Sequence, residues 1–276
     1  MPAETFDSWA KRVGAKPKTS GKRLRTLIFD TETAPMLSYI WGLRHQDYIP
    51  HGQVVHDSFL ICWSAQWRGE TKVHTGILTP TECVAQADQR IVVDLADLIR
   101  QADVVVAHNA KGFDVKMLKN RLLLLGLEDV GPVTVLDTLL LARRNFRLAS
   151  NRLDYLGEVL GVGRKHKTGG FDLWRRCYLG EQKALDEMRR YNRQDVVLLG
   201  KVLERMLPYL QGVPRLMDGD GTDQNGGCPY CGGKVAKDGL YRTGASTFQR
   251  VKCTVCGKYS RWSSALRNKK LSLRPL

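Results

Sequence analysis

Apolar residues follow two spacings along this chain, and both are concentrated in its central part. Short apolar runs predict buried strands at residues 24–29, 59–67, 72–78, 104–107 and 133–136. Apolar positions three and four residues apart predict helices at 83–100, 113–125 and 182–209, with shorter helical stretches near 138–144 and 151–160. Strands first, then strands alternating with helices, predict an α/β fold in which helices flank a mixed β-sheet.

The longest predicted helix marks the end of the main domain. Its core candidates lie on one side: Leu185, Met188, Val196, Leu199 and Leu203. It should end at Pro208, because proline cannot continue a helix without losing a hydrogen bond. The pattern therefore predicts a flexible arm (1–23), a main domain (24–210), a polar, glycine-rich linker (211–225), a small domain (226–262) and a basic tail (263–276).

Positive charge lies at the two ends of the chain. The net charge is +15 at pH 7. Residues 1–25 hold seven Lys and Arg against two acidic residues, and residues 226–276 hold eleven against one, which leaves 26–225 neutral with 25 of each. Basic extensions on a neutral body indicate binding to a polyanion such as nucleic acid. The alternative is that the two ends only keep the protein soluble.

The sequence disfavours a membrane-spanning protein and a secreted, disulfide-linked protein. The apolar runs are too short to cross a bilayer, and the N-terminus lacks the basic and apolar regions of a secretory signal. Seven unevenly placed cysteines do not form a disulfide framework. We expect no membrane association and a cytoplasmic location.

Acidic residues in three places are candidates for a metal site. Asp30 and Glu32 follow an apolar strand and, being two residues apart, face the same side of it. Clustered carboxylates repel one another unless cations neutralise them, and hard oxygen ligands suit Mg²⁺ or Mn²⁺. Asp114 begins a predicted helix, and Asp195 shares a helix face with Tyr191. Taken singly, each has a simpler explanation as a solvated acid or a helix-terminal charge.

The three places together resemble the motifs of the DEDD exonucleases, the DnaQ-like branch of the ribonuclease-H-like fold. The motifs are Asp30-x-Glu32, Asn109-x-x-x-Phe113-Asp114 and Tyr191-x-x-x-Asp195. The resemblance covers about residues 24–210 and extends to stand-alone domains of this kind in bacteria and their phages. Members of the histidine type have His five residues before the last Asp, where this chain has Arg190, so Tyr191 indicates the tyrosine type (DEDDy).

This resemblance implies a metal-dependent 3′–5′ exonuclease that acts on single-stranded or frayed ends, with DNA favoured and RNA open. It implies two Mg²⁺ or Mn²⁺ ions held by Asp30, Glu32, Asp114 and Asp195, which activate a water and stabilise the leaving oxygen. With an ordinary pKa of about 10, Tyr191 is expected to orient the water rather than act as a base.

The same resemblance places the side chains of Thr33, Asn109 and Phe113 beside the terminal nucleotide, although Phe113 has the alternative of a core position. Lys111, Lys165 and Lys167 have two interpretations, phosphate contacts or a solvated face. Asp137 is interpreted as a helix cap rather than a metal ligand.

Four of the seven cysteines form a second candidate metal site. Cys228 and Cys231 form one C-x-x-C pair, Cys253 and Cys256 form another, and 21 residues separate the pairs. This spacing is typical of a four-thiolate Zn²⁺ site, and each pair is followed by a glycine that suits a tight turn. Residues 226–262 thus resemble a β zinc ribbon with one structural Zn²⁺. A thioredoxin-like redox pair is the weaker alternative.

Basic and aromatic residues are mixed around the cysteine pairs, including Tyr241, Phe248, Arg250 and Arg261. This mixture suits phosphate contacts and base stacking, and docking of a protein partner is the alternative. For the whole chain two other functions stay open: an endonuclease or RNase on the same fold, and a non-catalytic nucleic-acid-binding adaptor.

Overall fold

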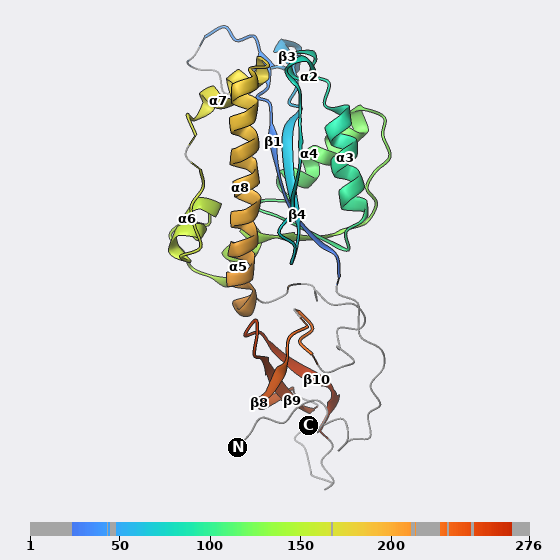
Figure 1. Cartoon of the computed structure of the whole chain (residues 1–276), viewed down its shortest axis with the longest axis vertical. Coiled ribbons are helices and arrows are strands. Elements are labelled where there is room, and N and C mark those ends of the chain that lie inside the picture. The colour runs from blue at the N-terminus through green and yellow to red at the C-terminus, as the bar shows by residue number, and fades with distance from the viewer. Residues whose placement is uncertain are drawn as a thin grey trace. The chain divides into compact units, whose positions relative to one another are not determined.

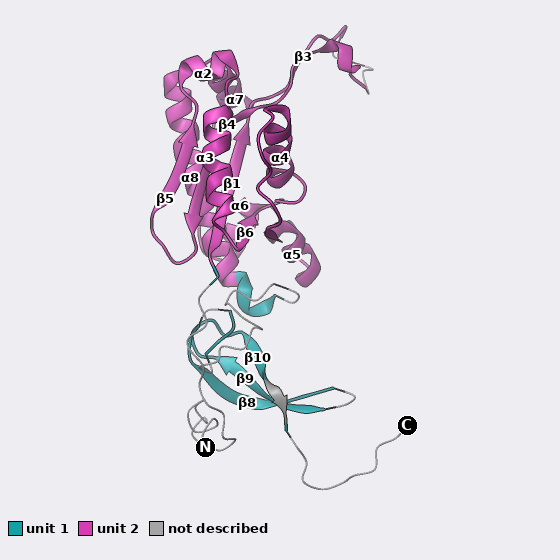
Figure 2. Cartoon of the chain, turned by 90° about the vertical axis from the view of Figure 1, so that its right-hand side faces the viewer, with its two compact units in different colours: residues 1–24, 206–276 teal, residues 25–205 magenta. Residues whose placement is uncertain are grey.

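The computed structural model describes residues 24–42, 44, 48–166, 168–210, 213, 227–230, 232–243 and 246–266. The chain has two compact units, coloured separately in Figure 2. The large unit is Arg25–Arg205, and the small unit joins Met1–Leu24 to Met206–Leu276. The predicted arm (1–23), nearly all of the predicted linker and most of the predicted tail lie outside the described residues, as do Lys167 and Cys231.

A five-stranded mixed sheet forms the centre of the large unit. Its order is β5-β4-β1-β6-β7, with β4 antiparallel to β1 and β5, and with β6 parallel to β1 and β7. The strands are β1 (Thr26–Thr33), β4 (Leu60–Trp67), β5 (Val73–Ile77), β6 (Val104–Ala107) and β7 (Thr134–Asp137). Each corresponds to a run of strand-forming apolar residues.

Helices flank this sheet, with α8 on one side and α3 and α4 on the other (Figure 1). Their bounds are α2 (Pro80–Ala85), α3 (Gln89–Arg100), α4 (Asp114–Leu124), α5 (Thr138–Asn145), α6 (Leu153–Val159), α7 (Phe171–Tyr178) and α8 (Gln182–Met206), with 3₁₀ turns at η1 (His51–Gln53) and η2 (Leu207–Tyr209). The predicted mixed sheet flanked by helices is therefore confirmed.

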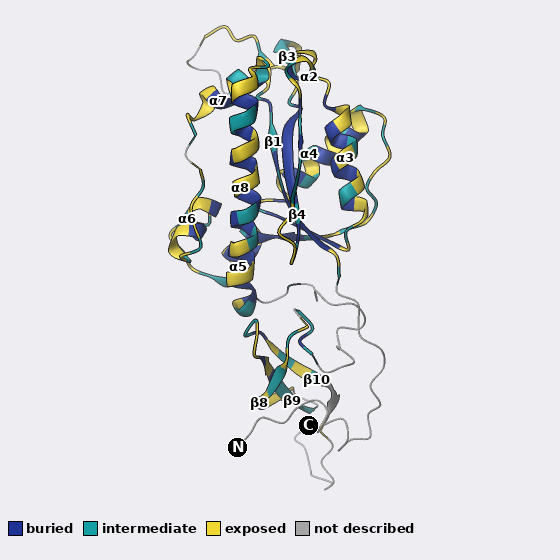
Figure 3. Ribbon diagram, in the orientation of Figure 1, coloured by how far each residue is buried: buried dark blue, intermediate teal, exposed yellow. Residues whose placement is uncertain are grey.

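The core lies between the central strands and the helices. All but one of the residues of β4 are buried, and the β1 residues before Asp30 are buried as well (Figure 3). The five predicted core residues of α8 are all buried: Leu185, Met188, Val196, Leu199 and Leu203. Burial on both faces explains why the central strands are continuous apolar runs rather than alternating ones.

The small unit contains a three-stranded antiparallel sheet, β8 (Val235–Arg242), β9 (Thr247–Cys253) and β10 (Tyr259–Ala265). Within this unit Lys258 is buried, and its Nζ donates to the carbonyl oxygens of Leu207, at 2.8 Å, and Leu210, at 2.5 Å. The predicted hairpin is present as β8 and β9, and β10 is an additional strand. A predicted C-terminal β-domain is confirmed in this form.

Three local predictions differ from the structure. The helix predicted at 83–100 is two helices, because Gln86 adopts a left-handed backbone (φ 55°) that ends α2. Helix α7 has only eight residues, too few for its spacing to stand out in the sequence. Residues that precede β4 form a small hairpin of β2 (Leu37–Ser38) and β3 (Val54–His56).

An ion pair at the start of α3 ties the sheet to two helices. The Asp88 carboxylate is fully buried, accepts from Leu60 N at 2.9 Å, and accepts two bonds from the Arg121 guanidinium at 2.8 Å each. Replacing Asp88 with alanine leaves a cation and an amide without their partner. We expect a loss of about 3–5 kcal/mol of unfolding free energy by urea titration. The exposed Asp97→Ala control should lose less than about 1 kcal/mol, and similar losses in both variants would contradict this role.

Candidate active site and cysteine site

Two carboxylates project from β1 toward the same side. Asp30 and Glu32 lie two residues apart within the strand, so they share a face, while Thr31 between them points away. Asp30 is opposite Ser64 and Glu32 is opposite Cys62 on β4. The central strand therefore presents both acids at a fixed spacing.

Helix α8 brings a third carboxylate to the pair. Asn192 is fully buried, and its Nδ2 donates to Asp30 Oδ2 at 2.7 Å, which fixes this turn of the helix against β1. One turn further, Asp195 is fully buried. Carboxylate oxygens of Asp30, Glu32 and Asp195 all lie within 4.8 Å of one another. Residues about 160 positions apart in the sequence thus form one acidic cluster.

Asp114 approaches β1 from the first turn of α4. Its Oδ1 accepts hydrogen bonds from Thr31 N at 3.1 Å and from Thr31 Oγ1 at 2.8 Å, and the residue is buried. Asp114 is not within the 4.8 Å cluster, but its charge raises the pKa of Asp30. All four predicted acids are therefore at one end of β1, three of them close together and the fourth held by Thr31.

Burial makes this concentration of carboxylates electrostatically unfavourable without a cation. Desolvation, followed by the charges of its acidic neighbours, raises the pKa of Asp30 well above its ordinary value. Desolvation also raises the pKa of Glu32 to about 8 and that of Asp114 to about 6. Within the described residues Asp195 Oδ1 is buried and accepts no hydrogen bond. An oxygen-only donor set with an unused buried acceptor fits a hard divalent cation.

Within the part of the chain that the structure describes, one protein cation contacts the cluster. Lys165, in the segment between α6 and α7, places Nζ 2.6 Å from Asp195 Oδ2 and 3.1 Å from Tyr191 OH. Burial acts to lower the pKa of Lys165, but Asp195 and Tyr191 outweigh it and hold the pKa above its ordinary value, so the ammonium is retained. Among the described residues, this is one positive charge against four acids, so the site needs further cations.

Metal-free protein is expected to lose stability as the pH rises from about 5 to about 8. Raised carboxyl pKa values mean that the folded chain binds more protons than the unfolded chain, where such groups titrate near pH 4. The resulting stabilisation is complete below about pH 4 and is lost as the pH passes the folded pKa values of about 6 for Asp114 and about 8 for Glu32.

Calorimetry checks this prediction. In EDTA the Tm of the large unit should fall by about 5 °C over this interval, and saturating Mg²⁺ should remove the fall. A Tm in EDTA that rises from pH 5 to pH 8 would contradict this prediction.

The turn before α4 positions the predicted substrate-binding residues of the second motif. Asn109 has a left-handed backbone (φ 75°), and its carbonyl accepts from Gly112 N at 3.0 Å and Phe113 N at 2.9 Å. Asp137 caps α5 as predicted and also holds this turn, because its carboxylate accepts from Asn109 N at 3.1 Å and Lys111 N at 3.0 Å.

Phe113 and Thr33 stand at the edges of the acidic site. Phe113 immediately precedes Asp114 and is 40% exposed, so the alternative of a core position for this ring is wrong. Thr33 ends β1 one residue after Glu32 and is half-buried. Their contact with a nucleotide stays a prediction.

Three side chains that the sequence did not single out hold the acids in place. Thr31 bonds to Asp114 and Asn192 bonds to Asp30. The third is Trp174 of α7, whose Nε1 donates to Glu32 Oε2 at 3.1 Å. Its ring also packs edge-on against Tyr191 at 5.9 Å. A signal for Asn192 existed, since it lies three residues before Asp195 on the same helix face. Trp174 had none, because α7 itself was not predicted.

The second cluster lies in the small unit and consists of thiols. The Sγ atoms of Cys228, Cys253 and Cys256 lie within 4.8 Å of one another, and Cys231 is outside the described residues. The Sγ atoms of Cys228 and Cys256 are 3.6 Å apart.

The two cysteine turns repeat one geometry. Cys228 Sγ accepts from the amide two residues later at 3.4 Å, and Cys253 Sγ does the same at 3.3 Å. Gly232 and Gly257, each four residues after the first cysteine of its pair, both have φ of 72° and donate back to that cysteine's carbonyl. Two matched turns that aim sulfur atoms at a common point suit a tetrahedral metal site.

Comparisons with known proteins bear on the large unit. Residues 67–207 match the sequence model of a family described as the RNase_H superfamily. No curated protein matches the chain. A similar solved structure is that of the family B DNA polymerase from the hyperthermophilic archaeon Pyrobaculum calidifontis, with a TM-score of 0.50 and 17% identity. The match covers 67% of this chain and 25% of the polymerase chain, so the likeness is one of fold over about a quarter of that protein.

Proposed function

The chain belongs to the RNase H superfamily, and from this premise we propose that it is a metal-dependent 3′–5′ exonuclease of the tyrosine-type DEDD family. The observation that carries the proposal is the cluster of Asp30, Glu32 and Asp195 oxygens within 4.8 Å, beside Asp114. We propose that its substrate is a single-stranded or frayed nucleic acid, with DNA favoured over RNA. We also propose that it acts in the cytoplasm. Among the described helices none is both long and apolar enough to span a membrane.

Two Mg²⁺ or Mn²⁺ ions are the cofactors that this donor set fits. Asp30, Glu32 and Asp195 would hold them together with Asp114. When bound, such ions supply Lewis-acid stabilisation of charge on the phosphate and lower the pKa of a nearby water. The chain adds no covalent nucleophile to this site, and its own contribution is to fix the four carboxylates.

Tyr191 is suited to orient the attacking water. Burial and then the charge of Asp195 raise the pKa of Tyr191 above its ordinary value, so the phenol keeps its proton at neutral pH. A protonated phenol can donate a hydrogen bond but cannot act as a general base. Two contacts restrict the position of Tyr191. Trp174 packs edge-on against its ring, and Lys165 Nζ donates a hydrogen bond to its hydroxyl.

Lys165 is proposed to affect metal binding and catalysis in opposite directions, and a single substitution can separate these two effects. Its ammonium competes with a divalent cation for Asp195, and it adds positive charge where the phosphate is proposed to react. We expect Lys165→Gln to bind Mn²⁺ more tightly by calorimetry and yet to lower kcat about tenfold or more. Lys165→Arg should restore much of kcat. Weaker Mn²⁺ binding together with lower kcat would indicate a structural role instead.

The cysteine site of the small unit is proposed to hold one Zn²⁺, and the β-sheet of this unit is proposed to bind nucleic acid. Arg261 lies 3.8 Å from the ring centroid of Phe248, while Arg250 and Lys252 lie 5.0 Å and 5.4 Å from that of Tyr259. These residues alternate along β9 and β10, so they share one face of the sheet. Cations and rings on one face suit backbone phosphates and stacked bases.

A degradation assay tests the proposed activity. Purified protein is incubated with single-stranded DNA and single-stranded RNA in Mg²⁺, Mn²⁺ or EDTA. We expect shortening of at least the DNA in either metal and none in EDTA. Binding without degradation of any substrate would favour the adaptor, and internal fragments as first products would favour an endonuclease.

A further inference from the structure

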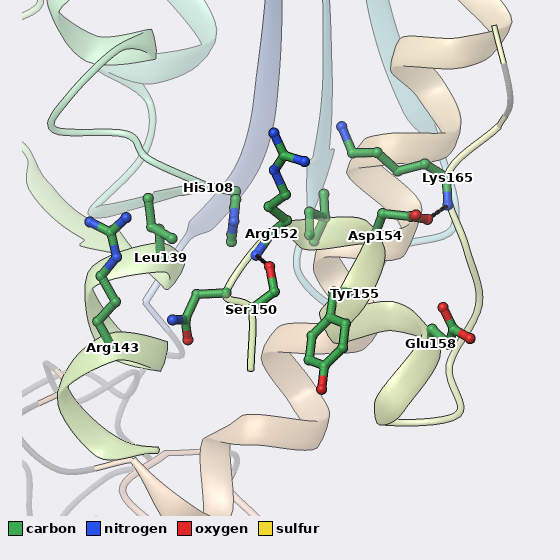
Figure 4. A pocket seen from close by; sticks show the side chains of 11 residues that line it. His108, Leu139, Arg143, Ser150, Arg152, Asp154, Tyr155, Glu158 and Lys165 are labelled. Atoms are coloured by element: carbon green, nitrogen blue, oxygen red, sulfur yellow. Dashed lines mark hydrogen bonds between the residues drawn. The ribbon is translucent and has the colours of Figure 1, made fainter. Parts of the chain in front are cut away.

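A large pocket opens beside the acidic cluster, on the side of α5 and α6. Its volume is about 940 Å³, and its walls come from the end of β6, from α5, from the α5–α6 connection, from α6 and from the segment that carries Lys165. We call it the α5–α6 pocket (Figure 4). No motif of the proposed activity includes the arginines that line it.

Positive charge dominates the polar lining of the α5–α6 pocket. Arg143 in the last turn of α5 and Arg152 before α6 both line it, and neither guanidinium has an ion-pair partner among the residues that the structure describes. In Figure 4 the side chains of Arg143, His108 and Arg152 follow one another across the pocket. The pocket therefore presents two arginine forks, which match phosphate oxygens in geometry and charge.

The two acids of the lining are already engaged. Asp154 Oδ1 accepts from Lys165 N at 2.8 Å, which secures the segment after α6. Glu158 is paired with Arg164. Within the described residues neither acid forms an ion pair with Arg143 or Arg152; Glu158 is neutralised by Arg164, whereas Asp154 keeps its charge because its partner is a neutral amide.

Lys165 connects the α5–α6 pocket to the acidic cluster. It lines the pocket, and its Nζ reaches Asp195 and Tyr191. A strand whose terminal phosphate lies at the acidic cluster can therefore place its next phosphates in the adjoining pocket. Leu139 and Tyr155 add apolar area against which sugars or bases can pack.

We propose that the α5–α6 pocket binds backbone phosphates of the nucleic-acid strand, upstream of the linkage that is cut, through Arg143 and Arg152. The inference rests on the proposed function for the direction of the strand, and on the charge and position of the pocket for the binding itself. A free nucleoside monophosphate offers the same phosphate chemistry and is the alternative source of the ligand.

The test compares the double variant Arg143→Gln/Arg152→Gln with the wild type in the full-length chain. A matched control is Arg144→Gln/Arg147→Gln, which removes two exposed arginines nearby that do not line the pocket. Kinetics are measured on a short DNA strand and on the p-nitrophenyl ester of thymidine 5′-monophosphate, which has no upstream phosphate. Strand affinity is measured separately by fluorescence anisotropy in EDTA.

For the pocket variant we expect the ratio of strand KM to ester KM to rise about tenfold relative to the wild type. The slope of log affinity against log salt should decrease by about 1.4, which is about 0.7 for each phosphate that the variant no longer neutralises. The control should retain the wild-type ratio and slope.

Each other outcome is decisive. An unchanged KM ratio and salt slope in the pocket variant would overturn the proposal. So would a variant that loses only competitive inhibition by thymidine 5′-monophosphate, because the pocket would then hold free nucleotide. If the wild type cuts neither substrate but the variant still loses strand affinity and slope, the exonuclease proposal fails and the phosphate site stands.

Discussion

Replacing Asp30 with asparagine is expected to lower metal-dependent hydrolysis about a thousandfold, with little change in the fold. The amide keeps the volume of the carboxylate and still offers an oxygen to Asn192 Nδ2, which lies 2.7 Å from Asp30 Oδ2 in the wild type. It removes one of the charges that would hold and orient the metal ions, and removal of one preorganised electrostatic interaction typically costs a hundred- to about a thousandfold in rate.

The Asp30→Asn result needs measurements that separate chemistry from stability. Rates at saturating Mg²⁺ and Mn²⁺ should be compared with urea denaturation of the same samples in EDTA. Since burial and acidic neighbours raise the pKa of Asp30, removal of its charge should leave the metal-free fold as stable or more stable. Asp97→Asn, a surface substitution, is the control. Full activity in Asp30→Asn would show that the acidic cluster is not the catalytic centre.

Replacing Cys228 with serine is expected to remove one equivalent of zinc and to unfold the β-sheet of the small unit. A structural four-thiolate site contributes about 10–16 kcal/mol of apparent binding free energy in peptides, far more than so small a sheet obtains from its core. Elemental analysis and limited proteolysis measure the two effects. The large unit should keep its own melting transition, because its core is separate.

A second cysteine variant controls for nonspecific effects of losing a thiol. Cys177 is buried in the core of the large unit, and burial raises its pKa to about 12, so it stays a neutral thiol. Cys177→Ala should therefore retain the full zinc content even if it destabilises its own unit. Equal zinc in wild type and Cys228→Ser would refute the zinc assignment.

The central strands and the long helix were predictable because single elements carry their own pattern. The apolar run before Asp30 is buried on both faces, and the five core residues of α8 repeat at helical spacing. The acidic residues were predictable from their order and neighbours, although no one of them was persuasive alone. What joined them was the order of the three motifs along the chain, and the spacing of Tyr191 and Asp195 indicated the tyrosine type.

The positioning residues could not be predicted because they depend on contacts between distant elements. Trp174 reaches Glu32 across 142 positions of sequence, from a helix too short to show a clear period. Lys165 lies in an irregular segment, where nothing in the sequence separates a contact with Asp195 from a solvated side chain. Asp137 shows the intermediate case: its role as a helix cap was predicted, while its hold on Asn109 required the tertiary structure.

The most direct test of the proposed activity is the order in which products leave a labelled strand. Single-stranded DNA with a label on its 3′-terminal nucleotide is followed over time in Mg²⁺, beside a strand whose last 3′ linkage is a phosphorothioate. A 3′–5′ exonuclease releases the labelled mononucleotide first, and the phosphorothioate slows that release. Internal fragments that appear before the mononucleotide, or release that begins at the 5′ end, would contradict the assignment of the Asp30, Glu32, Asp114 and Asp195 site as a 3′–5′ exonuclease centre.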